Sequence, residues 1–150
     1  ILHLWENPIL EFGRVITEYL KYNTRNSLNL RKVNMNQINL KGVDLQGANL
    51  QGANITDANL ERANLCRANL EDAILIGVDL ERADLQGANL VRADLRGANL
   101  KYAQLEASRW AQLDITKVFS QLKNTEFNYI VIEDQELRRV YRSELFDNEE

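Results

Sequence analysis

The chain has 150 residues, 45% of them hydrophobic and 27% charged, which is the ordinary composition of one soluble domain with a hydrophobic core. Its formal charge of −4 argues against non-specific nucleic-acid binding and against a polybasic membrane-binding patch. No apolar run is long enough to span a bilayer, and the single cysteine, Cys66, excludes an internal disulfide. Because no secretory signal is visible either, we expect a cytoplasmic protein.

Residues 1–27 are predicted to form an N-terminal helical cap. Pro8 suits a helix start, and apolar residues follow close to helical spacing in residues 9–22, at Leu10, Val15, Ile16, Tyr19 and Leu20. We expect this helix to cover the beginning of the region that follows.

Residues 28–107 repeat every five residues. Leu occupies one position of each repeat, with two exceptions, Met35 and Ile55. Ala predominates two positions before this Leu, and Asn or Asp stands between them, as in "ANLQGANITDANLERANLCRANL" (48–70). Six of the seven glycines share one of the two remaining positions.

This period predicts neither an α-helix nor a long strand. A helix would rotate by about 500° per repeat, so the leucines would spiral around all of its faces. Ala-Asn-Leu instead has the in, out, in alternation of a short extended segment. The next pair, for example Gln86 and Gly87, suits a tight turn whose second central residue has positive φ. Sides and corners therefore alternate in a stacked coil that buries Ala and Leu.

The A-(D/N)-L-x-x pattern resembles the pentapeptide-repeat family. The resemblance implies a mainly β fold, a right-handed quadrilateral β-helix with four repeats per coil. Sixteen repeats would then make four coils, 28–47, 48–67, 68–87 and 88–107. At a strand spacing of about 4.8 Å, this stack would be roughly 19 Å tall.

In such a tube, residues twenty positions apart stack, so outward side chains form columns. For one column we predict an amide ladder, Asn29, Asn49, Asn69 and Asn89. Another column is charged, with two adjacent glutamates between two lysines, Lys41, Glu61, Glu81 and Lys101. Beside it stand Gly42, Arg62, Arg82 and Tyr102, and we expect the arginines to neutralise the glutamates.

Two isoleucines break the polar pattern of the outer surface. Ile74 replaces the usual Asn or Asp, and Ile76 stands at a corner, so both are predicted to face outward. Their neighbours in adjacent coils are polar, Asn54, Thr56, Asp94 and Arg96. We select Ile74, Ile76 and Arg96 as a candidate interaction surface. The alternative is that a flanking segment covers the two isoleucines.

Residues 108–150 are predicted to form a C-terminal α/β cap. Residues 114–123 favour a short helix, 127–134 a strand and 134–146 a final helix. This segment is longer than a lid requires, so dimerisation or docking is a second hypothesis for it. The candidate contacts for a homodimer are Phe119, Leu122, Phe127, Ile130, Ile132, Leu137 and Tyr141.

No catalytic or metal-binding constellation is visible. The only histidine, His3, lies at the N-terminus, and Cys66 has no imidazole on its own coil. Glu71 and Asp72 form an acidic pair at a convex corner, which indicates a solvated turn rather than an acid/base site. We therefore predict no enzyme activity, no metal and no cofactor.

Three functions remain as hypotheses. The leading one is a noncatalytic scaffold that binds another protein, and not nucleic acid or membrane, through its flat faces. The resemblance also suggests a DNA mimic that binds DNA gyrase and protects it from quinolones. That mechanism needs an anionic rod, whereas residues 28–107 contain nine basic and ten acidic side chains, a formal charge of −1. The third is a regulatory or targeting domain, since a sequence without an initial Met is expected to be a processed or partial chain.

Overall fold

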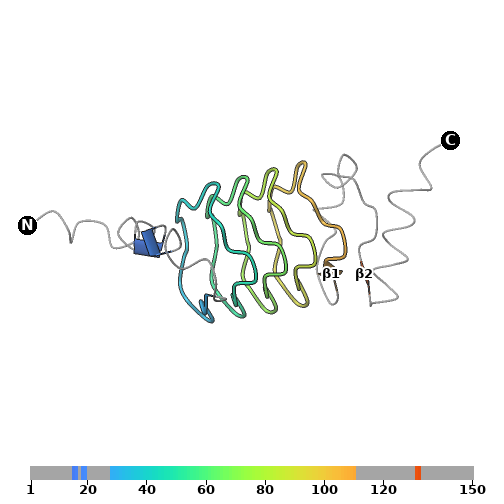
Figure 1. The fold of residues 1–150 in the computed structure, drawn as a ribbon, viewed down its shortest axis with the longest axis horizontal. Helices are drawn as coiled ribbons and strands as arrows, with labels where there is room; N and C mark the ends of the chain where they lie inside the picture. The colour runs from blue at the N-terminus through green and yellow to red at the C-terminus, as the bar shows by residue number, and fades with distance from the viewer. Residues whose placement is uncertain (1–14, 17, 20–27, 111–130, 133–150) are drawn as a thin grey trace, which may run out of the picture.

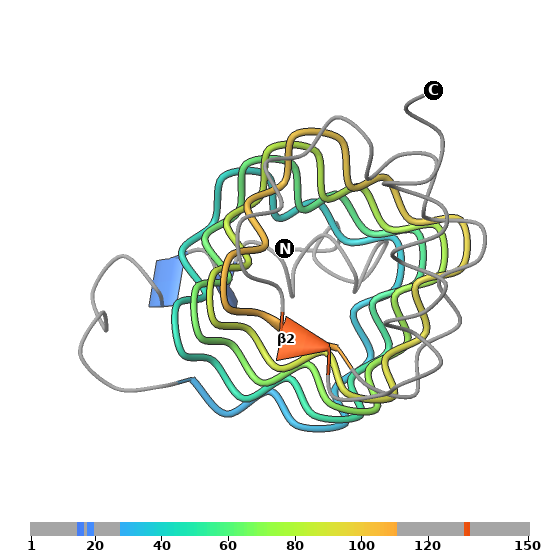
Figure 2. The ribbon, with the colours of Figure 1, turned by 90° about the vertical axis from the view of Figure 1, so that its right-hand side faces the viewer.

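Residues 28–110 wind into a tube of stacked coils (Figure 1). The computed structural model describes residues 15–16, 18–19, 28–110 and 131–132. Seen along its axis, the tube has a four-sided outline (Figure 2). Thirteen isolated β-bridges, all parallel, each join two residues that are 20 positions apart. Four repeats therefore make one coil.

The backbone hydrogen bonds explain the period of five, as the repeat 48–52 shows. Three of its N–H groups donate to carbonyls of the adjacent coils, at 2.8, 2.8 and 2.9 Å. The N–H of Ala48 closes the preceding turn onto the carbonyl of Leu45, at 3.0 Å. The fifth, that of Gln51, donates to the side-chain Oδ1 of Asn49 at 3.1 Å. Every N–H in this repeat is thus satisfied, as buried or packed backbone requires.

Each corner contains one residue with positive φ. In all sixteen repeats the last residue has a φ between +55° and +70°. Six of these residues are glycine, which adopts this conformation without steric cost, as the sequence predicts. The other ten are not, although a side chain makes this conformation less favourable, and they include Arg62, Arg82 and Tyr102.

Alanine and leucine side chains fill the tube. Every inward position between Ala48 and Leu105 is at most 3% exposed, and these residues form one continuous core. Met35 and Ile55, which replace Leu, are each 1% exposed. This burial, together with the hydrogen bonds between coils, is what stabilises a stack of short segments.

The N-terminal region is described at four residues only. Residues 15–16 and 18–19 are helical and lie within the predicted helix 9–22, the rest of which is outside the described residues. Ile16 is 5% exposed and joins the core, whereas Val15 and Tyr19 are 58% and 48% exposed. Only one of these three stripe residues is therefore buried. In the part of the chain that the structure describes, no helix is long and apolar enough to cross a membrane.

The repeat geometry continues to residue 110. Ser108 takes the position of the alanines, is fully buried and donates its hydroxyl to the carbonyl of Leu105 at 2.6 Å. Strand β1 (Arg109–Trp110) follows and extends the face that carries Asn89 (Figure 1).

Strand β2 (Val131–Ile132) pairs with β1 in parallel. It lies inside the segment 127–134 for which a strand is predicted, and it contains Ile132. The other candidate dimer contacts lie outside the described residues, namely Phe119, Leu122, Phe127, Ile130, Leu137 and Tyr141. The same holds for the two predicted C-terminal helices.

Candidate interaction surface

Ile74 lies on a face of the tube that we call the isoleucine face, with the outward column Asn34, Asn54, Ile74 and Asp94. β-Bridges join Ile74 to Asn54 in one adjacent coil and to Asp94 in the other. The side chain of Ile74 is 40% exposed, and Ile76 at the next corner is half-buried. Both residues therefore lie on the outside of the tube.

Ile74 also removes a hydrogen bond that other repeats possess. In fourteen of the sixteen repeats, Oδ1 of the outward Asn or Asp accepts the N–H two residues later, at 2.9 to 3.2 Å. Isoleucine cannot accept, and the Ile76 N–H has no acceptor among the described residues. The same is true of Glu106, which follows Gln104. The isoleucine face thus combines an exposed aliphatic side chain with an unused backbone donor.

The polar side chains around Ile74 bond to one another. Arg96 grips Asp94 through two nitrogens, with Nε 2.8 Å from Oδ1 and the terminal nitrogen 2.6 Å from Oδ2. These hydrogen bonds hold the pKa of Asp94 below its ordinary value. On the other side, the Thr56 hydroxyl donates to Oδ1 of Asn54 at 2.7 Å. Arg96, a predicted member of the surface, is therefore part of its neutral border.

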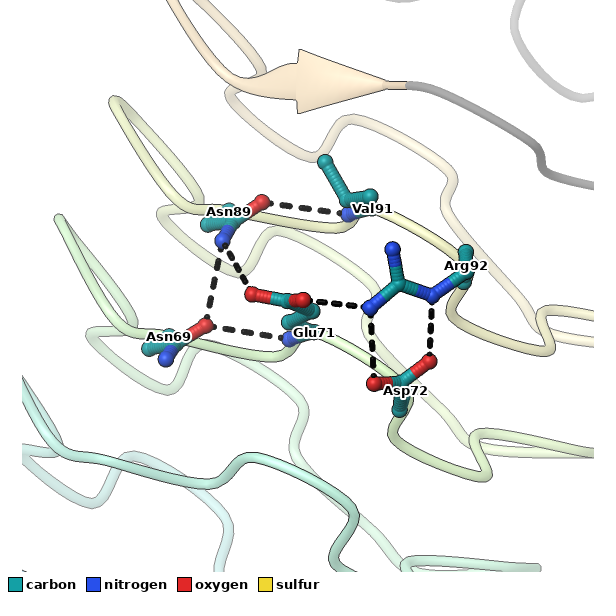
Figure 3. Close-up of polar contacts among 6 residues, drawn as sticks. All are labelled: Asn69, Glu71, Asp72, Asn89, Val91 and Arg92. Carbon is teal, nitrogen blue, oxygen red and sulfur yellow. Dashed lines mark hydrogen bonds and ion pairs between the residues drawn. The ribbon is translucent and has the colours of Figure 1, made fainter.

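Arg92 of the next coil pairs with both carboxylates of the acidic pair Glu71 and Asp72 (Figure 3). Arg92 donates to both oxygens of Asp72, at 2.7 and 2.9 Å, and also to Glu71. The hydrogen bonds from Arg92 lower the pKa of Asp72, and those to the two carboxylates raise the pKa of Arg92. The pairing of Arg92 with this corner is not predicted from the sequence. The pairing supports a structural role for the two carboxylates.

The predicted asparagine ladder is present at one step. On the asparagine face, which carries Asn29, Asn49, Asn69 and Asn89, the amide of Asn89 donates to Oδ1 of Asn69 at 3.2 Å (Figure 3). Among the described residues the structure gives no other amide-to-amide bond in this column. The shared task of the column is instead to cap the corner N–H. The sequence signal for that task is the choice of Asn or Asp over Gln, because only the short side chains reach the N–H two residues on.

The glutamates of the charged column are paired as the sequence predicts. Lys41 Nζ lies 2.6 Å from Glu61, Arg62 Nε lies 3.6 Å from Glu61, and Arg82 pairs with Glu81. The hydrogen bond from Lys41 lowers the pKa of Glu61.

Nothing in the described part of the tube suggests catalysis. No group of three or more His, Cys, Asp or Glu residues there could hold a metal ion. Cys66 is a free, half-buried thiol at a corner, and His3 lies outside the described residues.

These features define a solenoid repeat protein in which each five-residue repeat forms one side of a closed coil. The profile of the family described as "Pentapeptide repeats" matches with eight copies, over residues 27–62, 44–82 and 73–109. The chain therefore belongs to the pentapeptide-repeat family, whose solenoid is the right-handed quadrilateral β-helix.

Several solved structures are similar to the chain. HetL from the cyanobacterium Nostoc, a pentapeptide repeat protein involved in heterocyst differentiation regulation, is 34% identical over 53% of this chain and 46% of its own, with a TM-score of 0.45. The chain thus spans about half the length of HetL. A pentapeptide repeat protein from the Arabidopsis thaliana thylakoid lumen is 22% identical over 80% of this chain and 81% of its own, with a TM-score of 0.49.

QnrB1, a plasmid-mediated fluoroquinolone resistance protein, is 14% identical over 78% of this chain and 65% of its own, with a TM-score of 0.46. No curated protein sequence matches the chain.

Proposed function

We propose that this chain is a noncatalytic protein-binding module whose contact surface is the isoleucine face. The observation that carries the proposal is Ile74, the only aliphatic residue among the sixteen positions, 29 to 104 in steps of five, that otherwise hold Asn, Asp or Gln. Replacing the capping Asn or Asp costs the fold a hydrogen bond, typically about 0.5–1.5 kcal/mol. The isoleucine side chain, 40% exposed, gives little packing in return. A partner that covers Ile74 and accepts the Ile76 N–H recovers both losses.

The border of the surface fits such a contact. Asp94 is paired with Arg96, Asp72 with Arg92, and Asn54 with Thr56. A partner can cover Ile74 without leaving these charges newly unpaired, which is the arrangement around many binding hot spots. Covering the exposed part of one isoleucine contributes only about 1 kcal/mol. Ile74 is therefore the centre of a wider contact that includes neighbouring coils.

The DNA-mimic alternative has less support. Residues 28–107 carry a formal charge of −1. Ten of their charged side chains are already engaged in ion pairs, namely Lys41, Glu61, Arg62, Glu71, Asp72, Glu81, Arg82, Arg92, Asp94 and Arg96. A rod that imitates a phosphate backbone needs a continuous row of unpaired negative charge. A regulatory domain within a larger protein is compatible with the proposal, because its contact surface would be the same.

The proposal is tested with quantitative affinity capture from an extract of the source organism, using the immobilised full chain and mass spectrometry. Ile74→Asn restores the capping residue found in other repeats and removes the aliphatic contact. The matched control is Val91→Asn, which removes an outward aliphatic side chain from the asparagine face.

We expect at least one protein to bind the unchanged chain and Val91→Asn, and to be depleted about tenfold or more with Ile74→Asn. The purified partner should then bind the chain directly in a titration. Equal recovery with all three chains would remove the isoleucine face from consideration. In parallel, a gyrase supercoiling assay with a quinolone should show no protection, and protection would favour the DNA-mimic alternative instead.

A further inference from the structure

One corner of the tube carries a row of exposed cationic and aromatic side chains, which we call the arginine ridge, Arg62, Arg82 and Tyr102. The N–H of Arg62 donates to the carbonyl of Glu81 at 2.8 Å, and the N–H of Arg82 donates to that of Lys101 at 2.9 Å. The three residues therefore stand in register on successive coils, about 4.8 Å apart. The ridge lies one face beyond the isoleucine face, past the column that contains Asp79.

The three residues of the ridge have a backbone conformation that disfavours folding. They have φ values of 58°, 58° and 59°, where a side chain is disfavoured by roughly 1–2 kcal/mol relative to glycine. Gly42 occupies the same corner position one coil earlier, so the tube accepts glycine there. Arg62 and Arg82 also place like charges on adjacent coils. Seven other corner residues have the same strained conformation, so the ridge is distinguished by its aligned cations and its aromatic ring rather than by its φ values.

Positive charge lies outermost on this corner. The side chains of Arg62, Lys41 and Arg82 are 59%, 49% and 47% exposed. Those of their partners Glu61 and Glu81 are only 19% and 28% exposed. An approaching molecule therefore meets the cations before the carboxylates.

Two cations of this corner have donors to spare. The Arg62 guanidinium reaches Glu61 only through Nε at 3.6 Å, beyond hydrogen-bond distance, and donates no hydrogen bond to any described residue. Lys101, beside Tyr102, forms no ion pair with the described part of the chain. Between them Arg82 lies over the ring of Tyr102, 5.1 Å from its centroid. This cation–π contact holds the ring, 56% exposed, at the surface.

We propose that the arginine ridge binds an acidic segment of another protein. The planar fork of Arg62 matches a carboxylate, and Lys101 takes a second carboxylate about two coils away. Tyr102 offers an apolar surface between them, and Tyr and Arg are the residue types that dominate binding hot spots. A nucleic acid is a poorer fit, because Glu61, Glu81 and Asp84 interrupt the positive charge that a continuous phosphate chain requires.

This second surface goes beyond the contact proposed for the isoleucine face and does not depend on it. The test is a fluorescence-anisotropy titration of the full chain with a short labelled peptide rich in glutamate, at low salt. The test variant is Arg62→Gly. Because glycine is favoured at this φ, the change should leave the fold intact, and thermal unfolding checks that. The control is Arg67→Gly, which removes the same charge from an exposed corner with the same φ of 58° on another edge of the tube.

We expect the peptide to bind the unchanged chain, with affinity that falls as salt rises. Arg62→Gly should weaken binding about tenfold, the loss of one charge-assisted bidentate contact, and Arg67→Gly should have less than about a twofold effect. Equal weakening by both variants would reduce the effect to net charge and overturn the proposal. So would absence of binding, tighter binding of duplex DNA than of the peptide, or self-association of the chain that Arg62→Gly abolishes.

Discussion

The asparagine face and the isoleucine face share one backbone but present different surfaces. In both, β-bridges join residues 20 positions apart, and the residues at the inward leucine positions are at most 5% exposed. Outside, the first carries an unbroken column of asparagines, whereas the second changes to Ile74 and then Asp94. The backbone of the tube is therefore compatible with most outward side chains, apart from the Asn or Asp that caps the N–H at each corner. A departure from the capping residue is informative because the fold does not require it.

The largest expected effect is the loss of stability when a buried leucine is truncated, and this loss should be equal beneath the two faces. Leu70 and Leu75 are the buried leucines beside Asn69 and Ile74, and both are 0% exposed. We expect Leu70→Ala and Leu75→Ala each to lower the free energy of unfolding by about 2–5 kcal/mol, by nearly the same amount. Urea denaturation measures this. A clearly smaller loss at Leu75 would mean that the isoleucine face is packed differently inside as well as outside.

The corners that border the two faces should respond less strongly and unequally. Gly77 borders the isoleucine face and Gly47 the asparagine face, and both have a φ of +65°. Alanine at either position is disfavoured by roughly 1–2 kcal/mol. A Cβ at Gly77 would also lie 2.3 Å from Oδ1 of Asp57, whereas one at Gly47 would meet nothing within 4 Å. We therefore expect Gly77→Ala to lower the thermal unfolding midpoint more than Gly47→Ala does.

A second substitution identifies the cause of that difference. Adding Asp57→Ala to Gly77→Ala removes the carboxylate that the new Cβ would displace. The double variant should then lose no more stability than Gly47→Ala. A persistent difference would place the strain in the backbone rather than in the contact with Asp57.

Exchanging the outward residues of the two faces should change the free energy of unfolding moderately, with opposite signs at the two positions. Ile74→Asn gives the Ile76 N–H an acceptor, and we expect it to raise stability by about 0.5–1.5 kcal/mol. Asn69→Ile removes the cap of the Glu71 N–H and the hydrogen bond from Asn89, and should lower stability by a similar amount. Amide hydrogen exchange at Ile76 should slow in the first variant. Loss of stability in both variants would show that each of these two positions depends on its present side chain rather than on the capping hydrogen bond.

The smallest expected effect is on the stability of the protein at acidic pH. Hydrogen bonds from Arg96 hold the pKa of Asp94 below its ordinary value of 3.8, so the carboxylate is stabilised in its charged form by folding. Its contribution is complete above that ordinary value and is lost as the pH falls through the lower pKa of the folded protein. Asp94→Asn keeps the capping oxygen and removes the titration. Thermal unfolding across the acid range should therefore be flatter in this variant, and an unchanged profile would contradict the pairing.

The interior was predictable from the sequence because burial alone selects for it. Leu and Ala at fixed places specify inward positions, and glycine marks corners with positive φ. The number of repeats per coil came from the resemblance, since pairing between residues 20 positions apart leaves no local signature. The unequal burial of Ile16 and Val15 was missed because helical spacing shows which residues share a stripe, not which are covered.

The candidate surface was predictable only in part. The outward positions of Ile74 and Ile76 follow from register, but the lost cap of the Ile76 N–H requires knowing that Asn and Asp accept from that N–H. The pairing of Arg92 with Glu71 and Asp72 was missed because it joins adjacent coils at a corner. The arginine ridge was visible as a column, while its strained φ values and spare donors come from the structure.

Bridged positions are always 20 residues apart, so the tube can be lengthened without changing its faces only by whole coils of 20 residues. A duplication of twenty residues adds one coil, about 4.8 Å in height, and leaves every later side chain on its original face. A duplication of five keeps inside and outside but carries everything after it a quarter-turn around the tube. An insertion of five residues between Arg62 and Arg82 would therefore split the arginine ridge between two corners, whereas an insertion of twenty would keep its members on one corner and only move them apart along the axis.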